Sequence, residues 1–304
     1  MRKSIFYLMI GCFMLSCVIS CGESEKDKKE RERASKISDS LALKVATLPT
    51  LDCLPVFVAY EKGMFKAQGL EMRIMPFTAQ IECDQALLEK KVECAVSDVF
   101  RTERMRTKDP GISYITQTGA YWQLIANRKA RVNEIRQLSE KMIAMTRYSA
   151  TDYLVNVALD SVHTENQVFR IQVNDVIIRL NMLHNNAMDA MMLTEPQATN
   201  ARIAGNPVLM DSRAKGIFPG VIVARGGLTD EHRRKQLDAF TTVYNMACDS
   251  INKFGIMHYA DILKKHCQTD DATVKALPKM VFEHTHQPKT ADLQRTKSVK
   301  WRTN

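Results

Sequence analysis

Short catalytic motifs are missing from the 304-residue sequence. It has no glycine-rich phosphate-binding loop, no Gly-x-Ser-x-Gly turn around a nucleophilic serine and no His-Glu-x-x-His zinc-binding pair. Internal repeats are also missing, and the only compositionally biased stretch is a charged run near the start of the chain. These absences favour a protein that binds a ligand without transforming it, so we predict that it is not an enzyme.

Paired cysteines are missing as well. Beyond the opening segment the cysteines are odd in number and show no Cys-x-x-Cys spacing: Cys53, Cys83, Cys94, Cys248 and Cys267. Neither a disulfide framework nor a zinc site is indicated, and we expect most of these side chains to be buried as small apolar groups. A bridge between Cys83 and Cys94, or between Cys248 and Cys267, remains an open alternative.

Metal ligands are sparse elsewhere. His284 and His286 have a spacing that places both on one face of a strand, but beyond Glu283 no cysteine or carboxylate ligand pattern lies close by. Methionines such as Met191 and Met192 are typical of core packing rather than of a copper site. We therefore predict no metal site and no cofactor.

Long runs of one charge are absent, although the formal net charge is +9. The basic residues are scattered, and they cluster only near the end of the chain, at Arg295, Lys297, Lys300 and Arg302. This distribution is typical of a solvated surface and argues against a nucleic-acid partner.

The opening segment predicts export. Arg2 and Lys3 precede an apolar stretch too short for a bilayer span, and Ser20-Cys21 then has the form of a lipoprotein cleavage site. We predict a signal peptide at 1–20, a lipidated Cys21 and a charged tether at 21–42, which together anchor the protein in the cell envelope, facing the periplasm or the outside. A transmembrane anchor is the alternative.

The rest of the chain alternates between strand and helix patterns. We expect helices at 54–65, 84–91, 152–162, 175–184 and 197–205 and from 230 onward. We expect strands at 43–48, 70–76, 93–96, 112–116, 122–127, 141–146, 169–173, 187–193, 207–210 and 220–224. The prediction is an α/β fold in two lobes, each a mainly parallel sheet flanked by helices, with a ligand cleft between them. Residues 43–120 and 213–304 form lobe 1, and 121–212 form lobe 2.

Three segments resemble a known family. They are KVATLPTLDCLPVFVAYEKGMFKAQGLEMRIMPF at 44–77, ALLEKKVECAVSD at 86–98 and DAMMLTEPQATNA at 189–201. The chain is similar over most of 43–255 to the type II periplasmic solute-binding proteins of ABC importers, in the NMT1/THI5-like group whose members take nitrate, sulfonates, taurine or thiamine-pyrimidine precursors. It departs from that family's usual pattern in the loop at 78–82.

The candidate ligand-binding residues lie in loops that follow strands, because helix N-termini there present unpaired N–H groups. The loop at 147–151 offers a guanidinium and two hydroxyls suited to an anion, while helix capping is the structural alternative for Ser149 or Thr151. An acidic side chain such as Asp52 or Asp98 would instead suit an amine. The full set of candidates is Thr50, Asp52, Thr78, Gln80, Ser97, Asp98, Trp122, Arg147, Tyr148, Ser149, Thr151 and Glu195.

The predicted function follows from the resemblance together with the anchor. We predict a monomeric, lipid-anchored substrate-binding protein that closes its lobes on a small polar solute, anionic, zwitterionic or aminopyrimidine-like, and delivers it to an ABC permease with its ATPase. Two alternatives stay open at this stage: an enzyme of thiamine-pyrimidine or menaquinone metabolism on the same fold, and a scaffold lipoprotein without a ligand.

Overall fold

The computed structural model describes residue 25, residues 28–30, 41–226 and 230–302. The chain divides into two units, Met1–Ala42 and Leu43–Asn304. In the first unit residues 28–30 are helical and exposed. The predicted signal peptide, the lipidated Cys21 and most of the tether lie outside the described residues. None of the helices in the described part of the chain is long and apolar enough to cross a membrane.

The second unit contains two five-stranded sheets. In the first sheet, β1 pairs in parallel with β2 and β3, and β10 runs antiparallel between β3 and β4. We call the half built on this sheet lobe 1. In spatial order its strands are β2 (Met72–Pro76), β1 (Leu43–Thr47), β3 (Cys94–Asp98), β10 (Gly220–Arg225) and β4 (Ile112–Gln117).

The second sheet has the same plan, and we call the half built on it lobe 2. Strand β6 pairs in parallel with β7 and β8, and β5 runs antiparallel between β8 and β9. Its strands in order are β7 (Phe169–Gln172), β6 (Met142–Met145), β8 (Ala190–Leu193), β5 (Gln123–Ala126) and β9 (Val208–Asp211). The predicted α/β fold with two helix-flanked sheets is confirmed, and the predicted strands coincide with observed ones. Each sheet is mixed, since one of its strands runs antiparallel to both neighbours.

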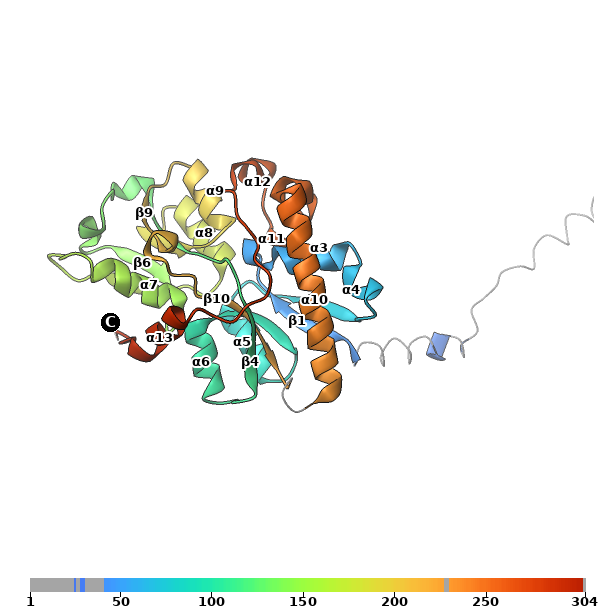
Figure 1. The fold of residues 1–304 in the computed structure, drawn as a ribbon. Coiled ribbons are helices and arrows are strands. Elements are labelled where there is room, and N and C mark those ends of the chain that lie inside the picture. The colour runs from blue at the N-terminus through green and yellow to red at the C-terminus, as the bar shows by residue number, and fades with distance from the viewer. Residues whose placement is uncertain (1–24, 26–27, 31–40, 227–229, 303–304) are drawn as a thin grey trace, which may run out of the picture. The chain divides into compact units, whose positions relative to one another are not determined.

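Helices flank both sheets. The lobe 1 helices are α3 (Leu54–Glu61), α4 (Met64–Ala67), α5 (Gln80–Leu88), α6 (Val99–Arg106), α10 (Glu231–Phe254), α11 (Ala260–Cys267), α12 (Asp271–Ala276) and α13 (Thr290–Ser298). The lobe 2 helices are α7 (Ala150–Leu159), α8 (Val176–His184) and α9 (Gln197–Ile203). Figure 1 shows the long α10 lying beside α3, where its apolar stripe of Phe240, Tyr244 and Ala247 is buried.

The hydrophobic cores lie on both faces of the sheets, because the side chains of each strand alternate between the faces. In lobe 2, Leu124 and Ile143 pack on one face of the sheet, while their neighbours Ile125 and Ala144 pack on the other. Successive side chains of a strand point to opposite faces, so two helical layers can each cover an apolar surface. The five cysteines from Cys53 to Cys267 are free and buried, as small apolar residues would be.

The chain crosses between the sheets twice, at 118–122 and at 212–219, and the two crossings touch. The Thr118 N–H donates to the Gly220 carbonyl at 2.8 Å, and the Ser212 N–H donates to the Trp122 carbonyl at 2.9 Å. A Cβ on Gly220 would lie 2.5 Å from the Cβ of Ala120, a distance that real side chains do not adopt. Glycine is therefore needed at the point where the crossings are closest. The predicted lobe boundaries, which fall at these crossings, stay a prediction.

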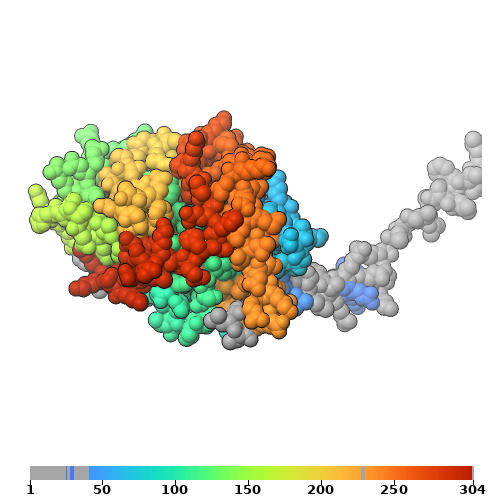
Figure 2. Space-filling model, in the orientation of Figure 1, coloured from blue at the N-terminus to red at the C-terminus, as the bar shows by residue number. Residues whose placement is uncertain are grey.

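The segment after α12 runs over both lobes. Figure 2 shows it as a continuous band on one face of the molecule. It packs α13 against α6 of lobe 1, and beyond α13 the Trp301 ring meets Phe100 of lobe 1 and Tyr148 of lobe 2 in edge contacts. Asn156 of lobe 2 donates to the Lys300 carbonyl at 3.2 Å. We call residues 299–302 the C-terminal strap.

Candidate ligand-binding site

A small cavity lies between the lobes, at the ends of the parallel strands. Its volume is about 30 Å³, space for about two water molecules. Most of the lining residues are polar, and they come from both lobes: Leu48, Thr50, Asp52, Gln80, Val96, Ser97, Trp122, Thr146, Ser149, Thr151, Val176, Arg179 and Thr194. Carboxyl ends of parallel strands share one edge of a sheet, so loops far apart in sequence meet there.

The hydroxyls of lobe 2 come from the turn between β6 and α7. Ser149 caps α7, since its Oγ accepts from the Thr151 N–H at 3.1 Å. The same Oγ donates to the Thr146 carbonyl at 2.7 Å, and the Thr146 N–H donates to Thr151 Oγ1 at 2.8 Å. Capping and lining the cavity are therefore compatible roles here, and the turn holds its hydroxyls in fixed positions.

Arg179 supplies a buried positive charge. Its side chain, 4% exposed, donates to the carbonyls of Val173 at 2.8 Å and Met192 at 2.9 Å and to Thr146 Oγ1 at 2.9 Å. No salt bridge within the described part of the chain includes it. Burial lowers its pKa to about 10, against the opposing effect of the negative charge of Asp175, so the guanidinium is charged at neutral pH. A buried guanidinium that lines a cavity and forms no ion pair with a described residue favours an anionic partner.

Lobe 1 contributes carboxyl groups. Asp52, 7% exposed, accepts from Thr118 Oγ1 at 3.3 Å, and burial raises its pKa. Behind the cavity, Asp84 forms an ion pair with Arg101 and accepts from Ser97 Oγ at 3.1 Å. Burial raises the pKa of Asp84 to about 6, although the charge of Arg101 opposes the shift. The lobe 1 wall therefore holds buried carboxyl groups with raised pKa values, opposite Arg179 of lobe 2.

Two candidates, Asp98 and Thr78, join the lobes rather than line the cavity. Asp98 Oδ1 accepts from the Arg101 N–H at 2.9 Å, which caps α6 of its own lobe, and Oδ2 accepts from the Ala150 N–H at 3.0 Å, at the start of α7 in the other lobe. Thr78 donates to Asp175 across the same boundary. These bonds hold the lobes together around the cavity.

Glu195 is buried in a network of lobe 2. It accepts from Tyr121 Oη at 2.7 Å and from the Thr199 N–H at 2.9 Å, and it pairs with Arg202 at 2.8 Å. Its own carbonyl accepts from the Leu51 N–H of lobe 1 at 2.8 Å. The side chain therefore organises the turn before α9, and only the backbone reaches across to lobe 1.

Arg147 and Tyr148 line an outer groove next to the cavity. This groove, about 1090 Å³ in volume, lies between α5 and α6 of lobe 1 and the turn after β6, and Thr146 lines both the groove and the cavity. Tyr148 has a left-handed backbone conformation with φ of 58°, and the Arg104 guanidinium lies 4.4 Å from its ring centroid, across the lobe boundary.

The structure thus brings seven of the candidates to the cavity: Thr50, Asp52, Gln80, Ser97, Trp122, Ser149 and Thr151. It places Thr78, Asp98 and Glu195 in contacts between or within the lobes, and Arg147 and Tyr148 in the groove. Sequence analysis missed Thr146, Thr194 and above all Arg179. The sequence did contain a signal for Arg179, which is the only charged residue in the stretch VIIRLNML at 176–183.

Among the described residues there is no cluster of His, Cys, Asp and Glu suited to a metal ion.

Solved structures with the same fold bind small solutes. The alkanesulfonate-binding protein SsuA from Xanthomonas axonopodis pv. citri, bound to MOPS, superposes with a TM-score of 0.69 at 12% identity, covering 85% of this chain and 90% of that one. SsuA of Escherichia coli, a periplasmic aliphatic sulphonate-binding protein, gives a TM-score of 0.65 at 12% identity, covering 84% and 85%. The periplasmic nitrate-binding protein NrtA of Synechocystis PCC 6803 gives 0.64 at 14%, covering 77% and 68%. At these identities the likeness establishes the fold.

Sequence comparisons give the family. Curated protein sequences yielded no match. A family model described as NMT1/THI5 like matches residues 50–263, which include the two sheets' central strands and both crossings. The predicted resemblance is thereby confirmed, and the chain belongs to the NMT1/THI5-like family.

Proposed function

We propose that this protein is the substrate-binding component of an ABC importer, anchored by a lipid on Cys21, and that it captures a small anionic solute between its lobes. The observation that carries the proposal is Arg179, a buried cation that lines the cavity between the two lobes together with the hydroxyl groups of Thr146, Ser149 and Thr151. Solute binding by the sulfonate-binding and nitrate-binding proteins of the same fold supports the class of function. The solute would then pass to a permease and its ATPase.

The chemistry of the cavity limits the solute. A carboxylate, sulfonate, nitrate or bicarbonate group accepts hydrogen bonds from a guanidinium and from hydroxyls, whereas a cation beside Arg179 would be repelled by a like charge. The cavity of about 30 Å³ holds only the charged group of a larger solute. The rest of such a solute would extend along Thr146 into the outer groove, toward Arg147 and Tyr148. Lobe opening admits the solute, and stronger binding to the closed form drives closure.

The first experiment is a thermal-shift screen of the purified protein, freed of bound solute, against nitrate, bicarbonate, taurine, alkylsulfonates, amino acids and aminopyrimidines. A solute that binds only the folded state raises the melting temperature in a saturable way. A shift with one class of anions supports the proposal. A shift with aminopyrimidines alone would contradict the anionic assignment, and no shift at all would favour the scaffold.

Arg179→Met then tests the site itself, with calorimetric titration of the solute found. Loss of a hydrogen-bonded charge pair costs about 1.5 to 3 kcal/mol, so affinity should fall roughly 10- to 150-fold. Arg179→Lys keeps the charge but loses the planar fork, and should fall between that variant and the wild type. Arg147→Ala tests the outer groove in the same titration, and Arg136→Met, at an exposed arginine paired with Glu134 and absent from the lining of the cavity and the groove, is the control. Unchanged affinity in Arg179→Met, combined with a large loss in Arg147→Ala, would move the anion to the outer groove.

The anchor has a separate test. Cys21→Ala removes the atom that carries the lipid, so the protein should move from the membrane fraction to the soluble fraction after cell lysis. Persistence in the membrane fraction would contradict lipidation at Cys21 and favour the uncleaved transmembrane anchor.

A further inference from the structure

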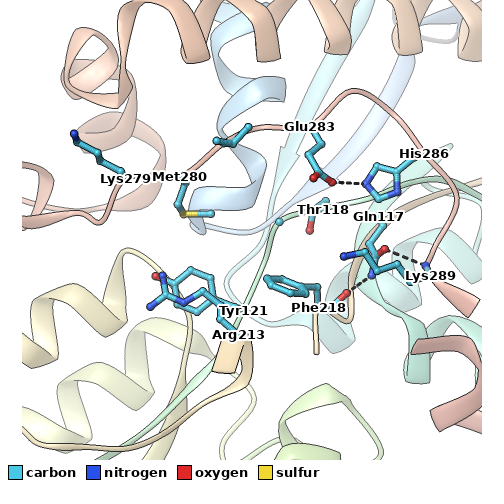
Figure 3. A pocket seen from close by; sticks show the side chains of 12 residues that line it. Gln117, Thr118, Tyr121, Arg213, Phe218, Lys279, Met280, Glu283, His286 and Lys289 are labelled. Atoms are coloured by element: carbon cyan, nitrogen blue, oxygen red, sulfur yellow. Dashed lines mark hydrogen bonds and ion pairs between the residues drawn. The ribbon is translucent and has the colours of Figure 1, made fainter. Parts of the chain in front are cut away.

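A second pocket lies at the crossings between the lobes, apart from the cavity. Its volume is about 200 Å³. One wall comes from Gln117 at the end of β4 and from the first crossing, a second from Arg213 and Phe218 at the other crossing, and the third from the segment at 279–289. Figure 3 shows this arrangement, with Phe218 and Met280 on either side of the space and His286 at its far end. We call it the hinge pocket.

One part of the hinge pocket is apolar and large enough for a ring. Phe218, Met280 and Val281 line it, together with Tyr121. An engineered cavity of about 150 Å³ binds benzene, so the hinge pocket has room for a ring-sized body with one substituent.

The rest of the hinge pocket is rich in positive charge. Lys279 has no hydrogen bond or ion pair with any described residue, and Lys289 Nζ lies 5.1 Å from the centroid of the Phe218 ring. Arg213 lies 3.8 Å from the Tyr121 ring centroid and pairs with Asp211. The one carboxylate in the lining, Glu283, is paired with His286 at 2.9 Å. The two lysines are not paired with a carboxylate of the lining, so the pocket carries a net positive charge, which favours an anion.

The third wall is held firmly in place. Gln117 connects it to β4: its Nε2 donates to Asp292 Oδ2 at 2.8 Å, its Oε1 accepts from the Lys289 N–H at 3.0 Å, and its own N–H donates to the His286 carbonyl at 2.9 Å. Asn252 of α10 fixes the other side, since its Oδ1 accepts from the Phe282 N–H at 2.9 Å. A site with fixed walls loses little conformational entropy when a ligand binds.

We propose that the hinge pocket is a second binding site, for a small molecule with a ring-sized apolar body and one anionic group, and that its occupancy is coupled to binding in the cavity. The coupling follows from the walls: Tyr121 and Phe218 belong to different crossings, and movement of the lobes about those crossings changes their separation. A ligand that fits one separation better favours the corresponding arrangement of the lobes. The proposed coupling to the cavity rests on the proposed function, but the proposed binding in the hinge pocket does not.

Benzoate is the probe, titrated into the purified protein by calorimetry. Acetate lacks the ring, and benzyl alcohol lacks the charge. We expect saturable benzoate binding with a Kd of about 1 mM, within the usual limit of affinity per ligand atom, and weaker binding of both controls. No saturation below about 10 mM, roughly tenfold weaker than this, would overturn the proposal, as would equal binding of benzyl alcohol.

Variants then locate the site. The exposed pair Lys279→Ala with Lys289→Ala should weaken benzoate about fivefold without loss of stability, and Met280→Ala should weaken it through the apolar half. Arg179→Met, which disables the cavity, should leave benzoate binding unchanged. Benzoate binding that is lost in Arg179→Met but kept in the lysine variant would place the probe in the cavity and overturn the hinge site.

Coupling is measured by titrating the cavity solute with and without saturating benzoate. Linkage requires that each ligand change the affinity of the other by the same factor, and we expect a change of about threefold or more in either direction. Two independent affinities would overturn the coupling and leave the site. If no cavity solute exists, benzoate still binds to the hinge pocket, so failure of the proposed function is distinguishable from failure of this inference.

Discussion

The two lobes match strand for strand, yet their strand ends carry opposite chemistry. In each sheet three parallel strands are followed by one antiparallel strand that arrives from the far side of a crossing, and then by an edge strand. Each antiparallel strand even shows a register shift against its edge neighbour, between Ile222 and Val223 in lobe 1 and between Leu124 and Ile125 in lobe 2. The backbone plan is thus the same in both halves.

The difference lies in the side chains at the boundary. Lobe 1 places buried carboxyl groups there, at Asp52, Asp84 and Asp98, while lobe 2 places Arg179 and a group of hydroxyls. Topology therefore fixes where a site forms, and a few loop and helix residues decide what it binds. In our proposal lobe 2 holds the anion and lobe 1 supports the closed arrangement.

The largest expected difference between the lobes is the pH dependence of stability that Asp84 gives lobe 1. Burial raises its pKa from the ordinary value of 3.8 to about 6. A carboxyl whose pKa is higher in the folded state stabilises the fold fully below its unfolded pKa, and that contribution is lost as the pH rises through the folded pKa. The difference in unfolding free energy between wild type and Asp84→Asn should therefore fall by up to about 3 kcal/mol between a pH of about 4 and about 6.5. Urea denaturation of both proteins at several pH values measures it, and parallel curves would contradict the shift.

The next effect concerns the bond between the lobes. Asp98→Ala leaves the Arg101 and Ala150 N–H groups without their acceptor and should lower the unfolding free energy by about 2 kcal/mol. Asp98→Asn keeps one oxygen and should cost less, so it serves as the matched comparison. Equal stability of Asp98→Ala and wild type in urea denaturation would show that this contact does not hold the lobes together.

The C-terminal strap should have a smaller effect. Trp301→Ala removes edge contacts with Phe100 and Tyr148, one in each lobe, and should cost about 1 to 2 kcal/mol. Arg302→Ala is the control, because it breaks only an exposed ion pair with Asp160 and should cost less than about 0.5 kcal/mol. Thermal denaturation compares them. A control as damaging as Trp301→Ala would assign the effect to charge rather than to ring packing.

Sequence patterns predicted the strands well because their signal is local. Runs such as LKVAT at 43–47 and AMML at 190–193 are apolar, short and bounded by turn residues, and both are buried strands. The carboxyl ends of the strands were predictable as places where polar residues meet, and Thr50, Ser97 and Ser149, which were named as candidates, line the cavity.

The partners of individual side chains were not predictable, because they depend on distant segments. Asp98 precedes a helix as a ligand contact would, but its second oxygen bonds to Ala150, which only the packing of the lobes brings near. Arg179 is in the first turn of α8 rather than in a loop, and its direction into the cavity depends on the carbonyls of Val173 and Met192. The C-terminal strap lies outside the segments that resembled the family.

The aromatic residues at the lobe boundary give the molecule a built-in spectroscopic signal. The sequence has only two tryptophans, and both lie there: Trp122 lines the cavity, and Trp301 bridges the two lobes in the C-terminal strap. Intrinsic tryptophan emission therefore reports on the boundary and on no other part of the chain. Trp301→Phe leaves Trp122 as the single emitter, so solute capture becomes visible in stopped-flow fluorescence without any attached dye.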